Sequence, residues 1–150
     1  LNVVAGLSAW PALSDQWVLT PHPGELARLL DRRTSEVMDG LVDAVRELAR
    51  RSGAVVAGKS STVVLAHPDG RYAVIDGGNP AMGTGGTGDV FAGAVAGLIA
   101  GGMDGWLAAR AAALVHQLAG RSLRERAGIY LAEELPAEMG RIVDVGKPAW

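Results

Sequence analysis

The sequence predicts an α/β fold in which helices flank a mainly parallel sheet that ends in an antiparallel hairpin. Short β-branched runs alternate with stretches whose apolar residues recur at helical spacing, and this alternation is typical of a parallel sheet covered by helices. His67-Pro68-Asp69-Gly70 predicts the turn of the hairpin, because Asp-Gly tolerates the positive φ angles that a tight turn needs. The length of 150 residues fits one domain with a real core and is too short for two.

Strands and helices follow from these patterns in chain order. We expect strands at residues 17–20, 54–57, 62–66 and 71–75. We expect helices at 25–30, from Thr34 or Ser35 to about residue 52, at 90–100, at 107–123 and at 132–143. Gly53 supplies the stop of the second helix. The predicted inner stripe of the fourth helix consists of Ala111, Leu114, Val115 and Leu118.

Composition excludes several kinds of partner and site. The net charge of −2 gives no reason to expect nucleic acid or an anionic membrane as a partner. The absence of cysteine excludes disulfides and thiolate metal sites. The most apolar stretch, residues 90–115, is interrupted by Asp104 and Arg110, and its longest uninterrupted run is shorter than the roughly 20 residues of a spanning helix. No signal peptide pattern is visible, so we expect no membrane partner and a cytoplasmic location.

The stretch Gly83-Thr84-Gly85-Gly86-Thr87-Gly88-Asp89 carries the strongest chemical signal. A glycine-rich segment before a helix exposes backbone N–H groups, and the helix dipole adds to their attraction for anions. The glycines remove side chains that would block a close approach. The segment lacks the Gly-Lys-Ser/Thr ending of a Walker loop, and it follows a hairpin, unlike a dinucleotide fingerprint. It therefore predicts a site for phosphate or a developing oxyanion.

Asp89 stands at the start of the helix that follows this loop. A carboxylate beside an anion-binding loop can take a proton from a hydroxyl group while the N–H groups hold a transferring phosphoryl group. We therefore interpret Asp89 as a general base. The alternative is an ordinary helix N-cap, a position where aspartate is among the preferred residues.

Two motifs resemble those of one family. Residues Asn79–Val90 resemble the signature of the ADP-dependent NAD(P)H-hydrate dehydratases, which belong to the ribokinase-like superfamily, and Thr20–Glu25 resembles their second signature. The resemblance covers essentially the whole chain but only the C-terminal part of a family member. The opening, Leu1–Ala5, is similar to the segment after a family Asp-Ala-Asp motif that this chain does not contain. The resemblance implies a three-layer ribokinase-like fold with its N-terminal part missing, residues 1–150 being the C-terminal portion of a single domain.

The same resemblance implies a repair enzyme, a hydro-lyase that converts hydrated NADH or NADPH back to the intact cofactor. A phosphoryl group from ADP (or ATP) turns the ring hydroxyl into a leaving group, and phosphate is then eliminated. Asp89 is implied as the base at the substrate hydroxyl. The implied anion hole consists of Gly85, Gly86, Thr87 and Gly88, with Gly88 also bordering the nucleotide. Mg²⁺ is expected to arrive with the nucleotide phosphates, without a metal site built from protein side chains.

Two further segments are implied to bind ligands. His22, on a loop made rigid by Pro21 and Pro23, resembles the family histidine at the hydrated nicotinamide, and Glu25 either acts beside it or caps the next helix. The implied nucleotide-binding loop consists of Gly58, Lys59, Ser60, Ser61 and Thr62. The family order there is Lys-Gly. A shift of one position reverses the side-chain direction in a strand, so either the loop is remodelled or Lys59 only partly replaces the expected role. The competing interpretation of Lys59 is a solvated surface residue.

The remaining polar residues are assigned structural roles. Asn79 either positions the glycine loop or is an ordinary turn residue, His116 is expected to be a core histidine, and His67 a turn residue. The expected ligands are an adenine nucleotide and hydrated NADH or NADPH. We further expect a homo-oligomer, and an epimerase domain upstream is an open alternative. A small-molecule kinase of the same superfamily and a truncated, inactive nucleotide-binding module are the competing functions.

Overall fold

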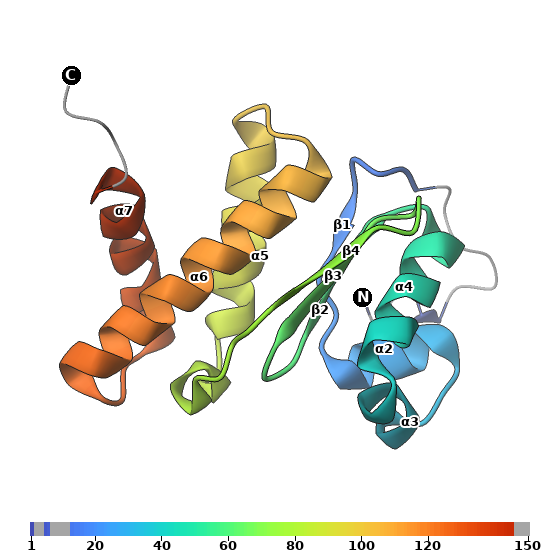
Figure 1. Ribbon diagram of the computed structural model, residues 1–150, viewed down its shortest axis with the longest axis horizontal. Coiled ribbons are helices and arrows are strands. Elements are labelled where there is room, and N and C mark those ends of the chain that lie inside the picture. The colour runs from blue at the N-terminus through green and yellow to red at the C-terminus, as the bar shows by residue number, and fades with distance from the viewer. Residues whose placement is uncertain (2–4, 7–12, 146–150) are drawn as a thin grey trace.

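A computed structural model describes residues 1, 5–6 and 13–145, in which one sheet lies between two layers of helices (Figure 1). The strands are β1 (Val18–Leu19), β2 (Val55–Lys59), β3 (Val63–Ala66) and β4 (Tyr72–Ile75). The helices are α2 (Pro23–Leu30), α3 (Thr34–Asp39), α4 (Leu41–Ser52), α5 (Thr87–Ala100), α6 (Gly105–Ala127) and α7 (Leu135–Val145), with short 3₁₀ turns at η1 (Pro80–Gly83) and η2 (Ala132–Glu134). The similarity noted for the opening segment falls on residues 2–4, which lie outside the described residues.

The sheet has the order β1-β2-β3-β4, and only β1 and β2 are parallel. β2 pairs antiparallel with β3, and β3 pairs antiparallel with β4. The expectation of a mainly parallel sheet is therefore wrong for the described strands. Parallel neighbours need a crossover of about a dozen residues or more, which the α2–α4 segment supplies between β1 and β2. The turns after β2 and β3 are too short for a crossover, so each of them forms a hairpin.

Helices cover both faces of this sheet, as the three-layer expectation requires. On one face, Val56 and Val64 pack with α2, α3 and α4. On the other face, Val55, Ala57 and Leu65 pack with α5 and α6. β2 and β3 are thus buried on both faces, which is why each reads as a continuous apolar run.

The single helix expected from Thr34 to residue 52 is wrong, because Gly40 divides it into α3 and α4. Gly40 has φ −130° and ψ 46°, which is not helical. Its N–H donates to the carbonyl of Glu36, and its carbonyl accepts from Ala44, so one residue ends α3 and begins α4. Apolar residues recur at helical spacing on both sides of residue 40, because both helices bury apolar residues in the same core.

The predicted inner stripe of α6 is also wrong. Leu114 and Leu118 are 52% and 40% exposed, whereas Ala109, Ala112 and Ala113 are buried. α6 contacts the sheet, α5 and α7, and alanines let it approach all three closely. Across residues 5–6 and 13–145, no helix combines the length and the apolar character that crossing a membrane would require.

Gly58→Ala is expected to destabilise the fold, because the added methyl group would overlap Cγ2 of Val45 on α4. Overpacking a filled core costs about 1–3 kcal/mol, and we expect a loss of this size in the free energy of unfolding measured with urea.

Gly93→Ala is the matched control, since a methyl group on this α5 residue meets nothing within 4 Å and alanine favours a helix. Adding Val45→Ala to Gly58→Ala should recover part of the loss. If the two substitutions were simply additive, the contact between Gly58 and Val45 would not be the cause.

Candidate active site

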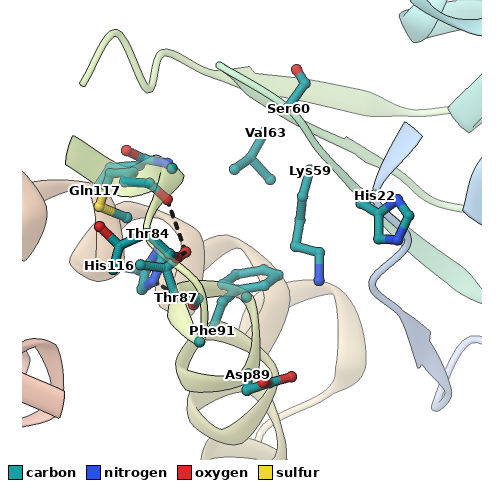
Figure 2. A pocket seen from close by; sticks show the side chains of 14 residues that line it. His22, Lys59, Ser60, Val63, Thr84, Thr87, Asp89, Phe91, His116 and Gln117 are labelled. Carbon is teal, nitrogen blue, oxygen red and sulfur yellow. Dashed lines mark hydrogen bonds between the residues drawn. The ribbon is translucent and has the colours of Figure 1, made fainter. Parts of the chain in front are cut away.

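A pocket of about 450 Å³ opens where β2 ends and α5 begins. Its lining comes from five parts of the chain, namely the loop after β1, the end of β2 with Ser60, the start of β3, the glycine loop with the beginning of α5, and the middle of α6 (Figure 2). The pocket therefore brings together residues that are far apart in sequence, including His22, Lys59, Asp89 and His116. This is the edge at which open α/β sheets commonly bind ligands.

The glycine loop forms the N-terminus of α5. Gly86 is the N-cap and has φ 94°, which favours glycine, and Thr87 is the first helical residue. Thr87 is not free to bind a ligand through its hydroxyl, because that group points back to the carbonyls of Met82 (2.8 Å) and Thr84 (2.9 Å). The N–H groups of Gly85, Gly86 and Gly88 have no acceptor within the described part of the chain. Three of the four predicted anion-hole residues thus have free N–H donors, and of these Gly86 and Gly88 line the pocket.

Asp89 is the third residue of α5, and its side chain lines the pocket. The N-cap alternative is wrong, because Gly86 occupies that position and Asp89 donates its own N–H to the Gly86 carbonyl at 3.0 Å. Within the described residues the carboxylate makes no hydrogen bond or ion pair. It is therefore free to accept a proton from a bound hydroxyl group.

Lys59 ends β2 and extends into the pocket between His22 and the glycine loop (Figure 2). A Cβ atom built on Gly88 would lie 3.0 Å from its Nζ, so glycine at 88 leaves room for the ammonium group. Burial lowers the pKa of Lys59 below its ordinary value, although the carboxylates of Glu25 and Asp89 oppose the shift. Lys59 is half-buried and lines the pocket, which favours a ligand-binding role over that of a fully solvated surface lysine.

The Gly58-Lys59 order follows from strand alternation. Gly58 lies against Val45 of α4, and Lys59 consequently faces the opposite side of the sheet, where α5 lies. Gly58 is not part of the pocket lining. The lysine therefore reaches the pocket because it occupies position 59, whereas a side chain at 58 would meet α4.

Ser60, Ser61 and Thr62 form the turn between β2 and β3. Ser60 donates its N–H to the Thr62 carbonyl at 2.8 Å, and Thr62 returns a bond to Ser60 Oγ at 3.2 Å. Ser60 lines the pocket, whereas Ser61 and Thr62 do not, and the Ser61 carbonyl packs against Gly77. Of the predicted nucleotide-binding loop, Lys59 and Ser60 are the members that reach the cavity.

His22 is the N-cap of α2, a role not expected from the sequence. Its Nδ1 accepts hydrogen bonds from the N–H groups of Gly24 (3.1 Å) and Glu25 (3.3 Å). Glu25 accepts from the His22 N–H at 3.0 Å, which completes a capping box. Because Nδ1 is an acceptor, the neutral imidazole carries its proton on Nε2. The cap thus fixes both the position and the tautomer of a histidine that lines the pocket.

His116 is buried, as expected, and it supports the glycine loop. Its Nε2 lies 3.0 Å from the Thr87 carbonyl, and its ring centroid lies 5.7 Å from that of Phe91. Burial holds the pKa of His116 below its ordinary value, with the Thr87 carbonyl opposing the shift and the Lys59 charge adding to it. A neutral imidazole with Nε2–H donates to Thr87, and this bond ties α6 to the start of α5.

Gln117 lines the pocket next to His116 and was missed by the sequence analysis. It is 6% exposed, and its Oε1 is buried without a hydrogen-bond partner among the described residues. Leaving a buried acceptor unpaired costs about 1–3 kcal/mol. The available signal was a carboxamide in an otherwise small-residue, inward-facing run of α6.

Asn79 positions the turn that leads into the glycine loop, which fits the first of its two interpretations. Its Oδ1 accepts from the Ala81 N–H at 3.1 Å, and its Nδ2 donates to the Tyr130 hydroxyl at 3.3 Å. The first bond caps η1, and the second joins this turn to the segment after α6.

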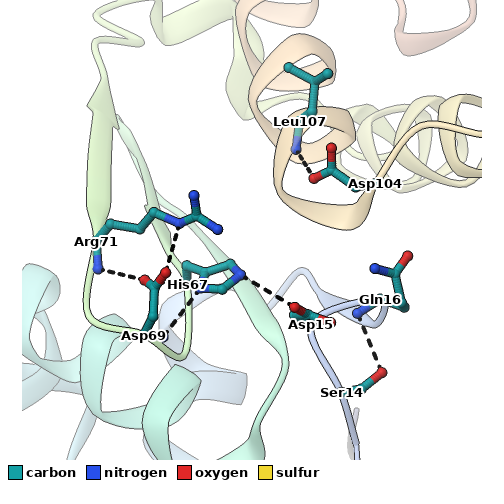
Figure 3. A network of polar contacts seen from close by, with 8 residues as sticks. All are labelled: Ser14, Asp15, Gln16, His67, Asp69, Arg71, Asp104 and Leu107. Carbon is teal, nitrogen blue, oxygen red and sulfur yellow. Dashed lines mark hydrogen bonds and ion pairs between the residues drawn. The ribbon is translucent and has the colours of Figure 1, made fainter.

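His67 is more than a turn residue, because it is buried between Asp15 and Asp69 (Figure 3). Its Nδ1 accepts from the Asp69 N–H at 3.2 Å, and its Nε2 lies 3.8 Å from Asp15. His67 is absent from the pocket lining. The sequence analysis missed this role because Asp15 is distant in the chain.

Comparison with known proteins identifies the family. The family model described as NAD(P)H-hydrate dehydratase matches residues 1–141. The chain belongs to the NAD(P)H-hydrate dehydratase family. The resemblance stated from its motifs is thereby confirmed.

Curated relatives agree with this assignment. The chain is 39% identical over 134 residues to the ADP-dependent (S)-NAD(P)H-hydrate dehydratase of Xanthomonas campestris pv. campestris, a match covering 88% of the chain and 46% of that protein. It is 44% identical over 111 residues to the bifunctional NAD(P)H-hydrate repair enzyme Nnr of Thermofilum pendens, covering 74% of the chain and 21% of that protein. The chain thus spans between a fifth and a half of the length of these family members.

A solved structure confirms the ribokinase-like α/β fold of the family. The ADP/ATP-dependent NAD(P)H-hydrate dehydratase of Bacillus subtilis, co-crystallised with ATP/Mg²⁺ and soaked with CoA, superposes with a TM-score of 0.81 at 29% identity. The match covers 87% of this chain and 49% of that one.

His116 should make stability depend on pH, because the unfolded chain protonates this residue at a higher pH than the folded one does. The free energy of unfolding should be highest above pH ~6.5, the ordinary pKa of histidine, and should fall as the pH drops below it. Urea unfolding at pH 7.5 and pH 5.5 measures the difference.

His116→Gln provides the control for this measurement, since glutamine can still donate to the Thr87 carbonyl but does not titrate. The loss between the two pH values should be smaller in this variant. An identical loss would show that another group causes the pH dependence.

Proposed function

We propose that this chain contributes the phosphate-handling part of an ADP-dependent NAD(P)H-hydrate dehydratase. The observation that carries the proposal is the convergence of an unpaired carboxylate, a half-buried ammonium group and free loop N–H groups on one pocket, at Asp89, Lys59, Gly86 and Gly88. This combination suits the transfer of a phosphoryl group to a hydroxyl group. The names of the relatives supply the substrates, hydrated NADH or NADPH and an adenine nucleotide.

The reaction proceeds in two steps. Asp89 takes the proton of the ring hydroxyl while the hydroxyl oxygen attacks the terminal phosphoryl group of ADP. The bond between this phosphoryl group and AMP breaks, and AMP is the leaving group. The N–H groups of the loop and the Lys59 ammonium stabilise the charge on the transferring group. Phosphate then departs with the electrons of the C–O bond while the ring loses a proton, and this elimination restores the reduced nicotinamide.

His22 is proposed to hold the hydrated nicotinamide. Its capped imidazole presents Nε2–H as a donor, and a donor of fixed position can orient a polar group on the ring. Glu25 contributes by fixing the imidazole and by lying close enough to Lys59 to favour its charged form.

Mg²⁺ is proposed to enter with the nucleotide phosphates. No group of three or more metal-ligating side chains occurs among residues 13–145, and Asp89 is the carboxylate of the pocket lining. A hard cation held mainly by phosphate and water oxygens fits such a site. ATP is the alternative donor, in line with the name of the Bacillus subtilis relative.

The proposal extends to the assembly around this site. Residues 1–150 are taken as the C-terminal portion of one ribokinase-like domain, acting in the cytoplasm within a homo-oligomer. The relatives named bifunctional support an epimerase activity that works alongside the dehydratase.

Asp89→Asn should abolish turnover while leaving nucleotide binding and folding intact, because asparagine keeps the shape but cannot accept the proton. Loss of a general base lowers the rate by about 10²–10⁴-fold. The assay follows the absorbance of reduced nicotinamide in a mixture of hydrated NADH, ADP and Mg²⁺.

Asp104→Asn is the control, since Asp104 is an exposed aspartate that caps α6. Unchanged turnover in Asp89→Asn would remove this residue from the base role. A stable phosphorylated product, without recovery of the reduced nicotinamide, would identify a kinase instead.

Lys59→Met should weaken ADP binding, because methionine keeps most of the length of the side chain but lacks its charge. Hydrogen bonds to charged groups are worth about 1.5–3 kcal/mol, so we expect roughly a 10- to 100-fold higher Kd by titration calorimetry. Lys59→Arg should retain part of the affinity. Equal ADP affinity in the methionine variant and the parent chain would exclude a contact between Lys59 and phosphate.

A further inference from the structure

The side-chain oxygen of Gln117 lacks a hydrogen-bond partner among the described residues. The residue lies on the buried face of α6. Its Nε2 lies 3.3 Å from the position that a Cβ atom on Gly77 would take, so the absence of a side chain at Gly77 makes room for it. Buried polar groups nearly always find a partner, and this side chain borders a pocket. A bound ligand can supply the missing partner.

The pocket has two chemically different ends (Figure 2). His22 and Lys59 lie at one end, and Gln117 and Thr84 lie at the opposite end. Met82 lies beside Gln117, because its sulfur packs against Gly120, one helical turn further along α6. One end therefore carries the Lys59 charge, whereas the other combines the apolar Met82 side chain with the uncharged polar groups of Thr84 and Gln117. The second kind of lining suits an uncharged ring system with a few polar edges.

We propose that Gln117 binds the nucleoside part of the adenine nucleotide by hydrogen bonding to its base or ribose. The inference rests on the proposed function, which puts the phosphates at Gly85–Gly88 with the transferred group toward Asp89. The remainder of the nucleotide then extends away from Asp89, toward the end of the pocket where Gln117 lies. A carboxamide offers a donor and an acceptor, and it exchanges them by rotating half a turn.

Gln117→Met tests the contact, because methionine has a similar size and shape but cannot form the hydrogen bond. ADP and AMP affinity should each fall about fivefold, the effect of losing one hydrogen bond, as measured by titration calorimetry on the purified chain. Affinity for pyrophosphate, which lacks a nucleoside, should not change. The unliganded variant should be at least as stable toward urea as the parent chain, because an unpaired buried oxygen is removed.

Two further variants complete the test. Gln16→Met makes the same replacement at an exposed glutamine and should alter none of these quantities. Gln117→Glu keeps the shape of the side chain but adds a negative charge near the phosphate loop, so ADP and AMP affinity should fall further than with methionine. If the methionine variant does not fold, the glutamate variant provides the ADP and AMP affinities in its place.

The outcomes separate this inference from the function on which it rests. A parent chain that binds ADP, with variants at position 117 that bind ADP and AMP equally well, would overturn the inference alone. An equal loss of pyrophosphate affinity in Gln117→Met would also overturn it, because the effect would then act through the phosphate loop. A parent chain that binds neither ADP nor AMP would overturn both proposals.

Discussion

The hydrogen bonds around Thr87 hold the start of α5, and the geometry of the pocket depends on them. The Thr87 hydroxyl ties the helix to the carbonyls of Met82 and Thr84, and His116 donates to the Thr87 carbonyl from α6. Thr87 and His116 are buried, so water competes weakly for these bonds. The start of α5 is therefore held in place beside the pocket, which Gly86, Gly88 and Asp89 line.

The end of β2 supplies the complementary charge. Gly58 and Lys59 face opposite sides of the sheet, so the close packing of Gly58 on Val45 also determines where the lysine points. Lys59 loses hydration in the pocket, and the nearby carboxylates of Glu25 and Asp89 offset part of this cost. The Lys59 charge can therefore attract an anion that arrives at the loop. Packing in the core and electrostatics in the pocket are thus linked through two consecutive residues.

The fold was largely predictable from local patterns, and the exceptions have physical causes. Strand and helix types were correct because β2, β3 and the helices each carry a strong apolar signal. The break at Gly40 was missed because α3 and α4 bury residues in one core and so keep a common periodicity. The inner face of α6 was predicted wrongly because leucines were expected to be buried in preference to alanines. The helix packs against the sheet, α5 and α7, and this close packing needs small residues on its inner face.

By itself, the sequence determined the family, and it predicted an anion site at the glycine loop and the candidate roles of Asp89 and His22. These conclusions rest on contiguous motifs, in which neighbours in the chain are also neighbours in space. Only the tertiary structure decided that Lys59 enters the pocket, that His116 supports the loop and that Gln117 borders it with an unpaired oxygen. Each of these depends on which face of a strand or helix meets another element, and that face is set by packing between segments distant in the chain.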